Sequence, residues 1–425
     1  MIVIAACTLP FDKNLIGHGT CVGIDDNAPC KGGPGTCHAG MCCEGCWDDV
    51  RCLPGTETLS CGEGGAACRA CLAPMNQCAV GHCAVERHVV TLSAGQHFVA
   101  IVDGLGALWT YGSRSDPGGG VCQPQSGFGK VGTDGQYSSA SASPDYADFL
   151  LAIGMDGARW SCGYNGNYEL GDNTTTSTDT IERIDDGPWS VIAAGFASSM
   201  GIKQDGTLWA WGYGEGNRLA LDVTNFVQTP TQVGTAASWQ SVVLGSAGFA
   251  IDSDTRMWSW GDGPIARTTA AIIAPVEPSS TSWREVSSGP HGHACGIRID
   301  GTLWCWGDNT LGQLGIEGTP SLPAPTQVDQ RMIWKHVAAG YDFTCATQTD
   351  GSLWCWGIND YAELGLGFMD PSPIRIPTRV GIETDWNLIT AGTDRACASK
   401  YDGTLWCWGS LIDGIKLSPT NKPLQ

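Results

Sequence analysis

Residues 300–315 read Asp-Gly-Thr-Leu-Trp-Cys-Trp-Gly-Asp-Asn-Thr-Leu-Gly-Gln-Leu-Gly, and a core of this stretch recurs along the 425-residue chain. The core is an apolar residue, Trp, any residue, an aromatic residue and Gly. Its seven copies, of which 159–163 is degenerate, lie at 108–112, 159–163, 208–212, 257–261, 303–307, 353–357 and 405–409. The first Trp residues of successive copies are 51, 49, 49, 46, 50 and 52 residues apart. A period of about fifty residues indicates a tandem-repeat architecture.

Each unit also has the signals of short β-strands. An apolar segment that usually begins with Trp and ends in Ala-Gly precedes each core, as at 334–340. Asp-Gly lies between the two segments, as at Asp300 and Gly301, and such a pair is typical of tight hairpins. In one unit Thr255 follows the Asp instead of Gly. Short strands in seven units predict an all-β fold, a seven-bladed β-propeller over residues 87–425.

Three units carry two cysteines, each five residues from the hairpin Asp. They are Cys295 with Cys305, Cys345 with Cys355, and Cys397 with Cys407. Symmetry about one residue predicts a three-residue loop that ends in a left-handed residue, a conformation that suits Gly. Directly opposed residues on the two strands lie within disulfide reach, so we predict three disulfides rather than three pairs of free thiols.

A fourth disulfide is predicted less directly. Cys162 occupies the second aromatic position of its unit, so it has no partner across a hairpin. Cys122 is the only unassigned cysteine nearby, and we pair it with Cys162.

Residues 21–86 form a segment rich in Cys, Gly and Pro. The chain has 21 cysteines, of which thirteen lie from Cys7 to Cys83, and this density indicates an oxidising compartment. A segment of this size needs cross-links to fold, so we predict a small module with six disulfides. The competing interpretation is a zinc site, with ligands from Cys43, Cys46, Cys68 and Cys71 and from His18, His38 or His82. Eight further cysteines in the segment favour disulfides.

Residues 1–20 are interpreted as a signal remnant and linker. Ile4-Ala5-Ala6-Cys7 resembles a bacterial lipobox, so we predict lipidation of Cys7 and expect the true start to lie upstream. Without Cys7, twelve cysteines remain in the N-terminal segment and eight in the repeats, so both sets can pair completely. The alternatives are an ordinary signal fragment or a spare thiol. We expect export to a bacterial cell envelope or surface, or otherwise secretion, with membrane attachment only through that lipid.

The net charge of the chain is −20. Nucleic acid and anionic lipid attract Lys and Arg, so the charge disfavours both as partners. A basic or neutral protein partner is compatible with it.

Residues 300–315 resemble the regulator-of-chromosome-condensation repeat, and residues 350–365 and 205–212 resemble it too. The resemblance covers residues 87–425 and is most specific in the fifth and sixth units. It implies seven four-stranded blades, and we expect a strand at Val89 and Val90 to complete the last blade. The founding members act on a nuclear GTPase and on chromatin, which the charge and the cysteines disfavour here. Other members bind proteins, including secreted bacterial inhibitors of β-lactamase.

The repeated Trp residues are predicted to pack between blades rather than to form a ligand cage. They are Trp109, Trp160, Trp209, Trp258, Trp304, Trp354 and Trp406. His97 and His293 align at one repeat position, where other units have Phe343 and Arg395, so we interpret both as structural or rim residues rather than catalytic ones. His291 adjoins His293 without further metal ligands. No catalytic residue, metal or cofactor is predicted, since no nucleophile elbow or zinc-protease motif occurs.

The function predicted from the sequence is a non-catalytic, monomeric, cell-surface or secreted scaffold that binds an unknown protein. Its contact face would be made by loops at 214–226, 308–325 and 358–377. The alternative is an exported propeller hydrolase or lyase that acts on polysaccharide. Such an enzyme would need carboxylates that converge at the central channel.

Overall fold

The computed structural model describes residues 88–113, 122, 126–133, 136–144, 148–184, 186–223, 225–261, 274–275 and 282–422, and six short strands before them. The chain divides into two compact units, 1–87 and 88–425. The first unit contains three antiparallel pairs: β1 (Thr36–His38) with β2 (Met41–Cys43), β3 (Cys46–Trp47) with β4 (Cys52–Leu53), and β5 (Gln77–Ala79) with β6 (His82–Ala84). Lipidation of Cys7 and the pairing of the cysteines in 21–86 lie outside the described residues.

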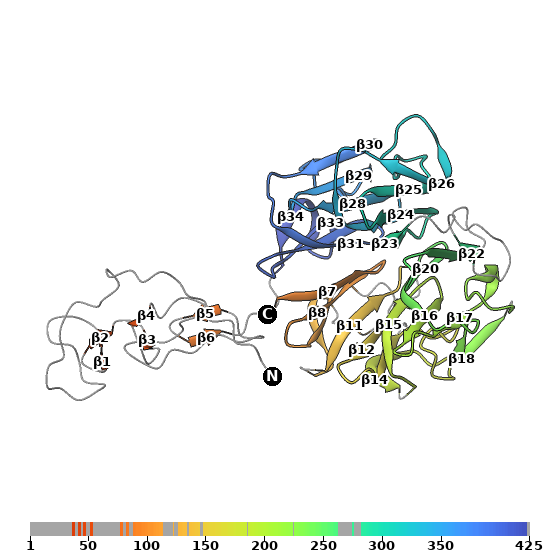
Figure 1. Ribbon diagram of the computed structural model, residues 1–425, viewed down its shortest axis with the longest axis horizontal. Coiled ribbons are helices and arrows are strands. Elements are labelled where there is room, and N and C mark those ends of the chain that lie inside the picture. Colours follow the sequence, from red (N-terminus) through yellow and green to blue (C-terminus); the bar gives the residue numbers. More distant parts are fainter. Residues whose placement is uncertain are drawn as a thin grey trace. The chain divides into compact units, whose positions relative to one another are not determined.

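The second unit is a ring of seven four-stranded antiparallel sheets in chain order, which confirms the predicted fold (Figure 1). The innermost strands are β7 (Val89–Ala94), β11 (Tyr137–Ala142), β15 (Trp189–Ala194), β19 (Trp239–Leu244), β23 (Trp283–Ser288), β27 (Trp334–Ala339) and β31 (Trp386–Ala391). The second strands are β8 (Phe98–Asp103), β12 (Phe149–Gly154), β16 (Ser198–Lys203), β20 (Gly248–Asp252), β24 (His293–Arg298), β28 (Phe343–Gln348) and β32 (Arg395–Lys400).

The third strands contain the repeated core. They are β9 (Leu108–Ser113), β13 (Arg159–Gly163), β17 (Leu208–Tyr213), β21 (Met257–Trp260), β25 (Leu303–Asp308), β29 (Leu353–Asn359) and β33 (Leu405–Leu411). The outer strands are β10 (Ser126–Val131), β14 (Thr178–Ile184), β18 (Phe226–Gln232), β22 (Ala274–Pro275), β26 (Ser321–Val328), β30 (Asp370–Val380) and β34 (Gly414–Asn421). A 3-10 turn, η2 (Glu215–Asn217), is the one helix in the described part of the chain, where no helix is long and apolar enough to cross a membrane.

The burial of each strand follows its place in the blade. The second strands are almost completely buried, because each blade is covered on both faces by its neighbours. The outer strands β14, β18, β26, β30 and β34 are largely exposed or half-buried, and five outer strands contain proline, at Pro230, Pro275, Pro323, Pro371 and Pro419 among others. Proline cannot donate a ladder hydrogen bond, so it discourages pairing of these edges with another chain.

The hairpin between the second and third strands has the predicted three-residue loop. In the fifth blade Arg298 N donates to Thr302 O at 3.0 Å, and Gly301 has φ +83°. The Asp300 carboxylate accepts a hydrogen bond from Thr302 N at 2.9 Å. Thr255 occupies the Gly301 position of the fourth blade with φ +63°, a conformation that costs a β-branched residue energy.

Disulfides join four cysteine pairs in the propeller. Three of them cross hairpins, with Cα atoms 4.1 Å apart: Cys295 to Cys305, Cys345 to Cys355, and Cys397 to Cys407. The fourth joins Cys122 to Cys162, whose Cα atoms are 5.7 Å apart. The three hairpin pairs hold the middle of their blades, where both residues of each pair are buried.

Every blade contacts the next through a hydrophobic cluster, and at least one tryptophan of the following blade takes part in each of the seven clusters. Trp354, a first Trp of the core, is half-buried at such an interface and donates to Ser352 Oγ in its own hairpin at 2.9 Å. The second Trp, Trp356, is completely buried and donates to Gln313 O of the preceding blade at 3.0 Å. Only the first Trp of each core was predicted to pack between blades, whereas the second makes the hydrogen bond between blades.

The ring closes differently from the prediction. The strand at Val89 and Val90 is the innermost strand of the first blade, and the last blade is completed by its own outer strand β34. The first and last blades, orange and dark blue in Figure 1, instead share a hydrophobic cluster. Val89 N also donates to Gly403 O at 3.0 Å. Residues 414–421 supply the fourth strand locally, so no exchanged strand is needed.

Candidate functional site on the loop face

The connections between first and second strands, and between third and fourth strands, leave the same end of each blade because adjacent strands are antiparallel. We call this end the loop face, and the end with the Asp-Gly hairpins the hairpin face. The three predicted contact loops, 214–226, 308–325 and 358–377, all connect third and fourth strands. They therefore lie together on the loop face, in the third, fifth and sixth blades.

Buried asparagines hold the third-to-fourth connections in three blades. Asn309 Oδ1 accepts from Leu314 N at 3.0 Å, and its Nδ2 donates to Ile316 O at 2.7 Å. Asn165 and Asn359 accept in the same way from Leu170 N and Leu364 N. These asparagines were missed in the sequence, although their spacing of five residues before Leu-Gly is a visible signal. They give the loop face a preorganised backbone.

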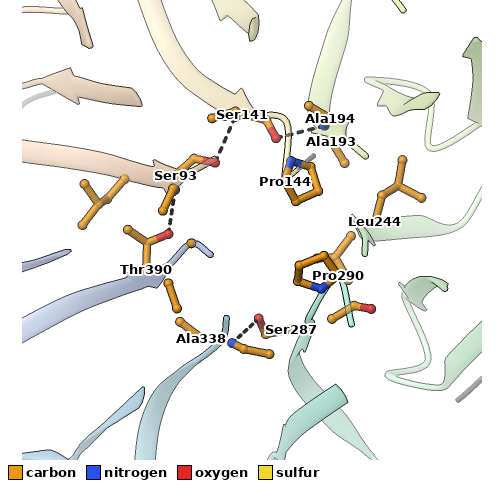
Figure 2. Close-up of a pocket in the computed structure, with 18 of the residues that line it drawn as sticks. Ser93, Ser141, Pro144, Ala193, Ala194, Leu244, Ser287, Pro290, Ala338 and Thr390 are labelled. Carbon is orange, nitrogen blue, oxygen red and sulfur yellow. Dashed lines mark hydrogen bonds between the residues drawn. The ribbon is translucent and has the colours of Figure 1, made fainter. Parts of the chain in front are cut away.

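The central channel opens as a cavity of about 310 Å³ lined by the innermost strands of all seven blades (Figure 2). Hydroxyl groups on its wall join neighbouring blades: Ser93 Oγ accepts from Ala142 N at 3.0 Å, and Ser287 Oγ accepts from Ala339 N at 2.9 Å. Thr390 Oγ1 accepts from Ala94 N at 2.8 Å and so ties the last blade to the first.

The lining of this cavity is Ser, Thr, Ala, Gly, Pro and aliphatic side chains, without a carboxylate or histidine. The carboxylate pair that a polysaccharide-cleaving enzyme would need is therefore not among the cavity-lining residues. Across the described residues, no group of three His, Cys, Asp or Glu side chains is placed to hold a metal ion.

The histidines do not share one repeat position as predicted. Phe98 pairs with Gly112 and His293 pairs with Gly307, so Phe98, not His97, is the equivalent of His293. His293 is buried, and burial lowers its pKa to about 4. Its Nε2 lies 3.0 Å from Thr344 Oγ1 of the next blade, which makes it a structural residue.

Two other histidines bridge blades on the loop face. His97 Nδ1 lies 3.0 Å from Asp148 Oδ2, and His291 Nδ1 lies 2.7 Å from Asp342 Oδ1. The ring of His291 stacks on Tyr341 at 4.5 Å. Burial raises the pKa of Asp342, although the hydrogen bond from His291 opposes this.

One buried position of the loop face carries Glu169, Gln313 or Glu363 in the second, fifth and sixth blades. The backbone carbonyl of each accepts the indole N–H of the second Trp of the following blade. Their side chains each accept a hydrogen bond from the backbone N–H two residues earlier. The hydrogen bonds to the backbone are thus the same at this position in three blades, and only the remaining contacts of the side chain differ.

Glu363 differs from Glu169 and Gln313 in these remaining side-chain contacts. Glu169 Oε1 accepts from Asn167 Nδ2 at 2.8 Å, and Gln313 Nε2 donates to Asp308 Oδ2 at 2.7 Å. Among the described residues, no side chain donates to Glu363, and its charged neighbours are the carboxylates of Asp360 and Asp394. Burial, together with these two carboxylates, raises the pKa of Glu363 to about 7.

The surface around this position is acidic and partly aromatic. Tyr361 is 52% exposed and Phe368 is 46% exposed, next to the exposed carboxylate of Asp360. Arg375 donates to backbone carbonyls at Asn309 and Thr310. The loop face can therefore offer carboxylates and aromatic rings to a partner.

Comparison with known proteins agrees with this architecture. The sequence profile described as "Regulator of chromosome condensation (RCC1) repeat" matches residues 300–347, and a second profile of that description matches 283–313 and 334–363. No curated protein matches the chain in sequence.

Solved structures share the fold. Prp20p of Saccharomyces cerevisiae, described with its binding to Gsp1p and histones, is 18% identical with a TM-score of 0.63, over 78% of this chain and 83% of that one. The same yeast protein with Kap60 bound is 17% identical with a TM-score of 0.64, over 80% and 86%. Human WBSCR16 is 18% identical with a TM-score of 0.62, over 75% and 88%. The chain is therefore a seven-bladed β-propeller that carries regulator of chromosome condensation repeats.

Proposed function

We propose that this protein is a non-catalytic scaffold that binds a protein partner through the loop face of its propeller. The observation that carries this proposal is the loop face itself, where buried Asn309 and Asn359 hold exposed loops in a fixed backbone conformation. Exposed aromatic side chains on rigid loops supply contact area at low entropic cost. The yeast relative is described with protein partners, which supports a binding role.

The proposal includes export and action as a monomer. Disulfides persist in oxidising compartments, and four of them in the propeller support such a location. Attachment to a bacterial envelope through a lipid on Cys7 is part of the same proposal. Intact mass of the exported protein tests it, since a diacyl or triacyl adduct on Cys7 is expected and an unmodified thiol there would contradict the anchor.

Site-directed photo-crosslinking in the native host tests the binding role. A photoreactive residue at Phe368 probes the loop face, and one at Ile382, which is 87% exposed in a connection on the hairpin face, is the matched control. We expect one discrete crosslinked protein from position 368 and none from 382. Crosslinking from 382 alone, or from neither position, would overturn the proposal.

A further inference from the structure

In three blades a basic side chain lies against two tryptophans on the hairpin face. It belongs to the last residue of the second strand, which pairs with the Trp that begins the first strand: Lys203 in the third blade, Arg298 in the fifth and Lys400 in the seventh. Lys203 Nζ lies 5.1 and 4.0 Å from the ring centroids of Trp189 and Trp209. Arg298 and Lys400 lie over the corresponding rings of their own blades, between 3.6 and 5.1 Å from the centroids. Indole faces attract cations, so these three blades each bind a positive charge of their own chain.

The fourth blade has both tryptophans but not the cation. Trp239 and Trp258 lie edge to face with ring centroids 5.9 Å apart, and Trp239 pairs in register with Asp252. Arg256 lies over the ring of Trp258, 5.6 Å from its centroid, and within the described part of the chain no basic side chain lies over Trp239. Trp239 is 9% exposed, whereas the first-strand Trp of each of the three cation-containing blades is 1% exposed. One aromatic face is therefore less covered in this blade than in the others.

A cavity of about 550 Å³ lies at this position, between the third and fourth blades. Trp239, Trp258, Asp252 and Arg256 line it, and most of the remaining lining comes from the connection 233–238, which has only small side chains after its first residue. In the connection that precedes the sixth blade, by contrast, Met332 packs against the cluster that contains the equivalent first-strand Trp. The cavity thus forms where a short side chain in the connection coincides with the loss of the cation.

The Asp252 carboxylate gives the cavity negative charge but no free acceptor. Its Oδ1 accepts from Asp254 N at 3.0 Å and Arg256 N at 2.9 Å, and its Oδ2 accepts from Arg256 Nε at 2.8 Å and Trp258 Nε1 at 2.9 Å. These four bonds use the capacity of the carboxylate. Arg256 pairs with both Asp252 and Asp254, so the three side chains together carry one net negative charge. A primary ammonium would bring N–H groups that this carboxylate cannot accept, whereas a quaternary ammonium has none and is bound by ring faces and charge alone.

We propose that the cavity between the third and fourth blades binds a quaternary ammonium group, with the rings of Trp239 and Trp258 against the methylated nitrogen and Asp252 supplying the charge. The fourth blade takes from solution the cation that three other blades take from their own chain. The hydroxyl groups of Thr235 and Ser238 also belong to the lining and suit the polar remainder of such a molecule. The site lies on the hairpin face, so it is separate from the proposed binding surface on the loop face.

Choline is the probe, and two ligands of similar size are its controls: 3,3-dimethylbutan-1-ol, the uncharged carbon isostere, and ethanolamine, the unmethylated cation. Binding to the full-length protein is measured by calorimetry at constant ionic strength. We expect choline to bind roughly tenfold more tightly than either control. The N-methyl proton resonance of choline should also shift upfield on binding, because those methyl groups lie over indole rings. No binding of choline, equal binding of the three ligands, or binding without the upfield shift would each overturn the site.

Two matched substitutions locate the site. Trp258→Leu removes one ring face and should weaken choline binding about tenfold, whereas Trp354→Leu makes the same change in the sixth blade, where Gln348 replaces the cation, and should leave binding unchanged. Asp252→Lys gives the fourth blade the residue of the third and should abolish binding. The tryptophan pair decides the question even if Asp252→Lys fails to fold, since equal losses from both tryptophan variants would contradict the site.

Phosphatidylcholine vesicles distinguish a free compound from a lipid headgroup as the source of the quaternary ammonium. Co-sedimentation of the wild type with these vesicles, lost in Trp258→Leu, assigns the headgroup. Choline binding without co-sedimentation assigns a free small molecule.

Discussion

Replacing Glu363 with Gln is expected to stabilise the free protein at alkaline pH. The substitution gives the sixth blade the residue of the fifth, where Gln313 accepts from Leu311 N and donates at 3.4 Å to Asp342, the equivalent of Asp394. It removes a buried carboxyl whose pKa rises from 4.5 to about 7 on folding. Since the pKa is higher in the folded state, the folded state binds the proton more tightly, and this stability is present below pH 4.5 and is lost as the pH rises towards 7.

The size of the effect follows from that pKa difference. At about 1.4 kcal/mol for each tenfold change in proton affinity, ionisation of Glu363 costs about 3 kcal/mol above pH 7. Glu363 is nearly fully buried, so solvent screens little of this cost. Unfolding free energy of a unit of this size changes by about 0.7 kcal/mol per degree near the midpoint, so Tm should rise by roughly 4 °C at pH 8.

Differential scanning calorimetry of the wild type and Glu363→Gln at pH 8 and pH 5 measures this difference. At pH 5 the variant should melt within about 1 °C of the wild type, because Glu363 is then protonated in the folded state. Glu169→Gln is the matched comparison: burial raises the pKa of Glu169 too, but this substitution also loses one of the two hydrogen bonds that Asn167 donates, so a smaller rise in Tm is expected. An equal rise at both pH values, or no rise at pH 8, would refute the assignment of a buried, strained ionisation to Glu363.

Three further substitutions test how the blades are built. Thr255→Gly removes a β-branched residue from φ +63° and should stabilise the fourth blade by about 1 kcal/mol in thermal melts, whereas a loss would contradict the strain. Replacing both Cys122 and Cys162 with Ser opens a link between residues 40 apart and should cost about 4 kcal/mol in thermal melts under oxidising conditions, whereas an unchanged Tm would contradict a stabilising cross-link. Trp356→Phe leaves the Gln313 carbonyl with the Thr344 hydroxyl as its remaining donor and should cost about 1 kcal/mol more than Trp354→Phe, which breaks only a bond within one hairpin. Equal losses for these two tryptophans would contradict the role of the second Trp between blades.

Features confined to one hairpin could be predicted from the sequence. Cys345 and Cys355 are ten residues apart, and the register between them depends only on the three-residue loop that joins their strands. The left-handed Gly351, with φ +79°, belongs to the same local geometry. Backbone sterics decide such short-range pairings, so spacing in the chain carries the information.

Contacts between blades were harder to predict. Trp354 and Trp356 look equivalent in the sequence and, being two residues apart, point to the same face of the strand, but only the second is completely buried. His97 seemed equivalent to His293 until strand register placed Phe98 at that position. A shift of one residue in the alignment of two repeats moves a side chain to the other face of its strand. The spacing of residues in the sequence does not by itself exclude such a shift.

The sequence by itself determined seven blades, their order and their hairpins, because each is encoded within a segment of about fifty residues. Only the tertiary structure decided how the ring closes and what surrounds Glu363. Its carboxylate neighbour Asp394 belongs to the next blade. The repeat sequence around Glu363 does not indicate which side chains of the next blade lie close to it. Burial and charge at this position arise when blades pack together, so the raised pKa of Glu363 is a property of the assembled ring.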